Sequence, residues 1–167
     1  MKTTLILAAL FSLAFGCSCP EGWSYLRITD QCYRYFDDPK NFEGAKAACA
    51  EQGAYLTDIQ SEEENTFVQA IAAQGRSGNW GIQPWIGGFT DTAVQNIQGL
   101  HWQWADGMVM NYTNWCPGDP NSWWERCVHM VIDDCPVCGS YFQLGCWNNL
   151  GCHNLVGYIC KRPTVSS

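Results

Sequence analysis

The chain has 167 residues, with 9 Lys or Arg against 16 Asp or Glu, which gives a formal net charge of −7. A nucleic-acid partner is not expected, because binding to phosphate backbones needs clustered Lys and Arg. The composition is rich in Trp, Tyr, Phe and Cys, so we expect a single domain with an aromatic, cross-linked core.

Residues 1–16 have the layout of a secretory signal peptide, with Lys2 followed by an apolar run from Leu5 to Phe15. That run is shorter than the roughly 20 residues that a membrane span needs, and no later stretch is longer. We therefore expect a secreted, extracellular protein without a membrane span. Cleavage would leave Cys17 first, as in a bacterial lipoprotein, but Ala14 stands where such signals usually have Leu, so we favour simple secretion.

Eleven cysteines follow this segment, and in an oxidising compartment they indicate a disulfide framework. Because the number is odd, at least one cysteine has no partner within the chain, and we expect it to be Cys17, which would then be available for a disulfide-linked homodimer. The alternative is a zinc site, since Cys135 and Cys138 form a CxxC pair with Cys146 and Cys152 beyond it. Secretion favours disulfides over zinc.

The predicted elements begin with a β-hairpin over 22–36, where aromatic residues alternate around a turn at 29–31. Helical spacing over 42–52 predicts a first helix that ends at Gly53. A second helix is predicted to start at Ser61, whose hydroxyl can cap the amide of Glu63 or Glu64 while Glu64 reaches back. Its buried face would be supplied by Phe67, Val68 and Ile71, and it would stop near Gly75.

The rest of the chain is predicted to consist of short strands and long turns. Strands are expected at 84–89, 100–105, 128–132 and 156–161, separated by segments dense in Gly, Asn, Asp and Pro. The order of strand, two helices and β-rich loops predicts an α+β fold. We expect one domain over 17–163 and a frayed tail over 164–167.

Six segments match, in order and spacing, the motifs of one known family. They are Trp85 to Gly88, Trp102 to Gly107, Tyr112 to Trp115, Asp119 to Asn121, Trp147 to Asn149 and Tyr158 to Cys160. In turn, they resemble the WIGL strand, the WxWxDG segment, the approach to the ligand loop, the sugar-specificity tripeptide, the WND motif and the final strand of the C-type lectin domain. The resemblance implies two helices, two small antiparallel sheets and long disulfide-stapled loops. It also implies the disulfides Cys19–Cys32, Cys49–Cys160 and Cys127–Cys152.

The same resemblance implies one calcium site that also binds sugar. The implied calcium and sugar ligands are Asp119, Asn121, Glu125, Asn148 and Asn149. Their oxygens are of the kind that calcium prefers. The family has a cis proline between the first two ligands, so Pro120 is predicted to be cis. An acid followed by an amide resembles the family's EPN loop and implies mannose-, glucose- or fucose-type sugars.

Two departures from the family pattern concern this site. Asp119 is one methylene shorter than the family's Glu, and Asn149 stands where the family has Asp. The ligand set then carries two formal negative charges instead of three, which should weaken calcium binding. The auxiliary calcium site of some members is not expected, because Ser122 and Arg126 occupy its acidic positions.

The segment between Cys127 and Trp147 is longer than its family counterpart and resembles an insertion. Four cysteines surround the candidate site and allow three connectivities: Cys116, Cys135, Cys138 and Cys146. Four aromatic side chains either add stacking surfaces for a sugar ring or a protein patch, or only pack the insertion: Trp123, Trp124, Tyr141 and Phe142.

The sequence therefore predicts a secreted calcium-dependent lectin that binds glycans on cell surfaces or microbes. The alternative is a lectin-like domain that binds protein, lipid or ice without calcium. Catalysis is not expected, because His101, His129 and His153 show no partnered acid or nucleophile. Asn111 begins an Asn-Tyr-Thr sequon, which predicts a glycoprotein.

Overall fold

The computed structural model describes residues 17–76, 83–91, 95–133 and 143–166. The predicted signal peptide lies outside the described residues, as do Cys135, Cys138, Tyr141 and Phe142. In the described part, no helix is long and apolar enough to cross a membrane.

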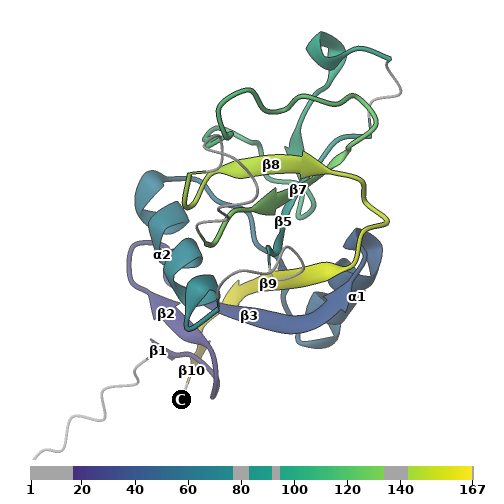
Figure 1. Cartoon of the computed structure of the whole chain (residues 1–167). Coiled ribbons are helices and arrows are strands. Elements are labelled where there is room, and N and C mark those ends of the chain that lie inside the picture. The colour runs from purple at the N-terminus through teal and green to yellow at the C-terminus, as the bar shows by residue number, and fades with distance from the viewer. Residues whose placement is uncertain (1–16, 77–82, 92–94, 134–142, 167) are drawn as a thin grey trace, which may run out of the picture.

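Figure 1 shows two helices packed around a twisted sheet, with long loops between β5 and β7 in the upper part of the view. The helices are α1 (Phe42–Glu51) and α2 (Glu62–Ala73), with a short 3-10 turn, η2 (Ile97–Gly99). The strands are β1 (Cys17–Ser18), β2 (Ser24–Leu26), β3 (Gln31–Lys40), β4 (Tyr55–Leu56), β5 (Trp85–Phe89), β6 (Gln103–Trp104), β7 (Cys127–Met130), β8 (Trp147–Leu150), β9 (Val156–Pro163) and β10 (Val165–Ser166).

Eight strands form one sheet in the order β2-β3-β9-β5-β7-β8, with β4 beside β9 and β6 beside β5. The pairs are antiparallel except for β5 and β9, which are parallel and meet at Trp85 and Tyr158. This contact joins the two expected small sheets into one. β1 and β10 form a separate two-stranded sheet, so Val165 and Ser166 are paired where a frayed tail was expected. The reason is that β3 and β9 already bring the two ends of the domain together.

Both helices end just before the predicted glycines, Gly53 and Gly75, and α2 begins at the predicted cap, Ser61, whereas the cap of α1 was not predicted. The Asn41 side chain caps α1 by accepting a hydrogen bond from the Gly44 amide at 2.8 Å, and Gly53 follows the helix with a φ of 62°. The Ser61 hydroxyl accepts from the Glu64 amide at 3.2 Å at the start of α2. The Glu64 carboxylate reaches back one residue further than a capping box, accepting from the Gln60 amide at 2.9 Å.

The core contains two clusters that lie on opposite faces of the sheet. Val156, Tyr158 and Cys160 of β9 pack in one cluster with Phe42 of α1, whereas Ile159 packs in the other with Val68 of α2. This is the alternation that a β-strand imposes on successive side chains. In Figure 1, α1 lies to the right of the sheet and α2 to the left.

Four disulfides are present among the described cysteines. Three are those implied by the resemblance: Cys19–Cys32, Cys49–Cys160 and Cys127–Cys152. The fourth joins Cys116 to Cys146 and resolves part of the open connectivity. With Cys146 and Cys152 in disulfides, the alternative zinc site loses two of its four ligands.

Candidate functional site

The candidate loop, residues 116–126, is attached to both ends of β8. Its first residue, Cys116, is bonded to Cys146 just before the strand, and Cys127 just after the loop is bonded to Cys152 beyond the strand. β8 also pairs antiparallel with β7, which begins at Cys127. These connections bring the loop onto β8, where Asn121, Ser122 and Glu125 contact Asn149. The peptide bond between Asp119 and Pro120 is cis, as predicted.

The strand bearing these asparagines is fixed by the fully buried Trp147. The indole N–H of Trp147 donates to the Asn65 side chain at 2.8 Å, and the rings of Trp104, Tyr112 and Trp115 surround it. The next two residues are therefore held on a rigid base. This explains why a strand with two central asparagines can form here, although Asn is unfavourable in strands.

Asn149 is completely buried beneath the loop and makes three hydrogen bonds to its backbone. Its amide nitrogen donates to the carbonyl oxygens of Ser122 at 2.8 Å and Glu125 at 3.1 Å. Its side-chain oxygen accepts from the Asn121 amide at 3.1 Å. Both ends of the amide group are thus engaged by the protein itself.

Asp119 and Glu125 place two carboxyl groups near each other in the loop. Burial raises the pKa of Asp119 to about 6, and the negative charge of Glu125 adds to the rise. Burial also raises the pKa of Glu125, and the Ser122 hydroxyl offsets part of this effect. The Asn121 side chain donates a hydrogen bond to Asp119. The two acids therefore repel each other, and this is the electrostatic condition that a bound cation relieves.

The side-chain amide nitrogen of Asn148 faces β7. Its nitrogen lies 3.2 Å from the Nε2 atom of His129, which is fully buried and whose pKa is lowered by burial to about 4. The neutral imidazole accepts this hydrogen bond. The buried side-chain oxygen of Asn148 has no hydrogen-bond partner among the residues that the structure describes. His129 was not predicted to take part in the site; its place beside Asn148 follows from the register of β7 and β8.

The donor set fits a hard cation that accepts carboxylate and amide oxygens. Three of the five predicted residues offer such oxygens in the loop, Asp119, Asn121 and Glu125, and a fourth, Asn148, offers one from β8. The side chain of Asn149 is already occupied by the loop backbone. Within the described ranges, no three His, Cys, Asp or Glu side chains gather as a metal-binding cluster. The charge available to a cation is therefore that of two carboxylates.

Two neighbouring tryptophans lie between Ser122 and Glu125. The rings of Trp123 and Trp124 meet edge to face at 5.5 Å, and the Trp124 side chain is 63% exposed. A rigid, exposed indole beside a polar loop provides a stacking surface. A role for Trp124 in stacking on a ligand stays a prediction.

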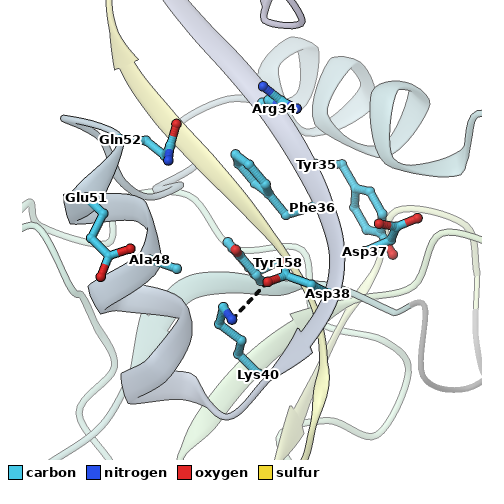
Figure 2. Close-up of a pocket in the computed structure, with 10 residues that line it drawn as sticks. All are labelled: Arg34, Tyr35, Phe36, Asp37, Asp38, Lys40, Ala48, Glu51, Gln52 and Tyr158. Carbon is cyan, nitrogen blue, oxygen red and sulfur yellow. Dashed lines mark ion pairs between the residues drawn. The ribbon is translucent and has the colours of Figure 1, made fainter.

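A hollow of about 410 Å³ lies between β3, β9 and α1, apart from the candidate loop. Figure 2 shows Ala48 and Glu51 on α1, Gln52 just after the helix, and Tyr158 between the helix and β3. Lys40 lies 2.8 Å from Asp38 within this hollow, so that acid already has an internal counter-ion. None of the predicted ligands lines it.

Two further predictions concern covalent changes. Asn111 and Thr113 are exposed and lie in a loop outside the strands, so the sequon is sterically open. Glycosylation of Asn111 stays a prediction. The side chain of Cys17 lies outside the described structure, and the Cys17-linked homodimer stays a prediction as well.

Comparison with known proteins places this geometry in a family. A model of the lectin C-type domain matches residues 38–162. The chain is 31% identical over 148 residues to the versican core protein of Rattus norvegicus, which covers 87% of this chain but only 4% of versican.

Solved structures of similar domains agree. The mouse scavenger receptor C-type lectin carbohydrate-recognition domain superimposes with a TM-score of 0.68 and 28% identity, covering 89% of this chain and 99% of that one. A calcium-independent type II antifreeze protein gives 0.70 and 25%, covering 90% and 98%. The chain therefore belongs to the C-type lectin domain family.

Proposed function

We propose that this domain binds glycans outside the cell through a calcium ion held at the 119–125 loop. The observation that carries the proposal is the pair of mutually repelling carboxyl groups of Asp119 and Glu125. The buried side-chain oxygen of Asn148, which has no hydrogen-bond partner among the described residues, adds support. C-type lectin domains are in general binding modules rather than enzymes. Secretion is supported by four disulfides, which persist in oxidising compartments.

The proposed ligand is a mannose-, glucose- or fucose-type sugar on a cell or microbial surface. A calcium ion bound by these oxygens would supply coordination positions for two vicinal sugar hydroxyls. Asp119 and Glu125 accept hydrogen bonds from those hydroxyls, and the side-chain amide of Asn121 can donate one. With two carboxylates, we expect a dissociation constant for calcium of about 10⁻⁴ to 10⁻³ M, in the range of extracellular modules.

The test is a glycan array run with calcium and with chelator, on the wild type and on two matched variants. Glu125→Gln removes a proposed ligand, whereas Glu51→Gln changes an exposed acid in the hollow of Figure 2. We expect chelator and Glu125→Gln to abolish binding and Glu51→Gln to preserve it. Chelator-resistant binding, or loss of binding in Glu51→Gln alone, would exclude the loop as the sugar site.

A second candidate is calcium-independent recognition of a protein, lipid or ice surface. Two observations favour it: the similarity to a calcium-independent antifreeze protein, and the loop contacts of Asn149, which require no ion. The same array distinguishes the two functions when it is combined with calcium titration calorimetry. Calcium binding in calorimetry without a glycan signal on the array would support neither function. The ligand would then not be a glycan, and the domain would still bind an ion.

A further inference from the structure

The amide of Asn149 matches the backbone of the loop atom for atom. Two N–H groups meet two carbonyl oxygens, those of Ser122 and Glu125, and one carbonyl oxygen meets the Asn121 amide, all within 3.1 Å. The residue is completely buried, so water does not compete for these contacts. Asn149 therefore joins the first half of the loop to the second.

A carboxylate at this position could not make the same contacts. Two of the three require a donor, and an oxygen in place of the amide nitrogen would lie about 3 Å from two carbonyl oxygens, acceptor against acceptor. Only a proton or a bridging cation would relieve that repulsion. The loop geometry of this chain is thus suited to Asn149 and not to the family's Asp.

We propose that Asn149 is a positioning residue that holds the 119–125 loop in its binding shape without a cation, and that it is not a calcium ligand. Its consequence for binding rests on the proposed function. Calcium would then be coordinated by Asp119, Asn121, Glu125 and Asn148. Because the loop is already ordered, the free energy of ion binding does not have to offset the entropic cost of ordering it.

The test is hydrogen exchange of the Asn121 amide, which donates to Asn149, measured in chelator and in millimolar calcium. The Thr57 amide, which donates to Ile159 at 3.0 Å in the core, reports global folding in the same experiment. In the wild type we expect the Asn121 amide to be protected in both conditions. A protection factor of the wild-type Asn121 amide at least about tenfold lower in chelator than in calcium would overturn the proposal, and this result needs no variant.

Two substitutions separate positioning from simple packing. In Asn149→Asp, we expect the Asn121 amide to lose protection in chelator and regain it with calcium. In Asn149→Leu, of similar size, protection should be lost in both conditions, with the Thr57 amide unchanged. Protection that persists in Asn149→Leu, or that calcium cannot restore in Asn149→Asp, would contradict the assignment.

Failure of this inference and failure of the proposed function give different results. An ordered loop with no calcium uptake in calorimetry leaves the role of Asn149 intact and overturns calcium-dependent binding. Calcium uptake by a protein whose Asn121 amide is unprotected in chelator supports calcium binding and overturns the role of Asn149.

Discussion

Two pairs of carboxyl groups in this domain have opposite surroundings. Asp58 and Glu64 are buried, and the Lys161 ammonium lies 2.7 Å from each. Asp119 and Glu125 lie together in the loop, and among the described residues no Lys or Arg forms an ion pair with either. The fold supplies the cation for the first pair, whereas the second is left to repel unless a cation comes from solution. This difference is the electrostatic basis of the calcium site that we propose.

The largest expected effect concerns the staple beside the first pair. Cys160 precedes Lys161 in β9 and is bonded to Cys49 of α1, closing a loop with a sequence separation of 111. Replacing both cysteines with Ala should lower the free energy of unfolding by about 4 to 5 kcal/mol, because the unfolded chain gains loop entropy. Denaturant unfolding measures this loss, and a change below about 1 kcal/mol would contradict it.

Removing the internal cation should be nearly as damaging. Lys161→Met leaves Asp58 and Glu64 buried without a counter-ion, and we expect a loss of about 3 to 5 kcal/mol. The matched control is Lys46→Met, which breaks a surface pair with Glu43 at 3.1 Å and should cost no more than about 0.5 kcal/mol. Equal unfolding midpoints for the two variants would show that the buried ammonium has no special role.

The loop pair should respond in the opposite way. Asp119→Asn and Glu125→Gln each remove one of two repelling charges, so the metal-free protein should be unchanged or more stable by up to about 1 kcal/mol. Each should weaken calcium at least about tenfold, since the ligand set loses half its charge. Calorimetric titration and denaturant unfolding of the same samples test both parts. A destabilised variant with unchanged calcium affinity would contradict the comparison.

The smallest expected effect is a dependence on pH. The pKa of Asp119 is raised from 3.8 to about 6, so the folded protein binds this proton more tightly than the unfolded chain does. In the metal-free protein the ionised Asp119 carboxylate therefore lowers the free energy of unfolding above pH 6. This loss is recovered as pH falls toward 4 and the carboxylate is protonated.

Calcium competes with the same proton. About a quarter of the Asp119 carboxyl groups are ionised at pH 5.5, so calcium affinity should fall about fourfold relative to pH 7.5. Asp119→Asn should remove most of this dependence, and calorimetry at the two pH values measures it. An affinity that does not change in the wild type would show that Asp119 is not a ligand.

Helices and single strands could be predicted because their signals are local. Asn41, Ser61 and Gly53 act on their immediate neighbours, and the hairpin of β2 and β3 needs only alternation and a turn. Residues 147–149 match a family motif but were not predicted to form a strand, and Asn is unfavourable in strands. The pairing of β8 with β7 and the burial of Trp147 override that preference.

The candidate site could be predicted only as a set of residues. The family resemblance implied five ligands and a cis proline between the first two: Asp119, Asn121, Glu125, Asn148 and Asn149. It could not show that the amide of Asn149 faces the loop backbone, or that His129 lies beside Asn148. Hydrogen-bond orientation depends on which backbone atoms are within about 3 Å, and these come from distant segments.

The sequence by itself determined both helices and the inventory of acids and amides, because spacing and capping act between near neighbours along the chain. Three of the disulfides were implied by the family resemblance, and only the structure paired Cys116 with Cys146. The tertiary structure alone decided which acids are neutralised. Lys161 is 103 residues from Asp58 and 97 from Glu64, yet its ammonium lies between them, whereas the nearby Asp119 and Glu125 receive no such partner among the described residues. Charges interact through space, so only the fold shows which pair has an internal counter-ion.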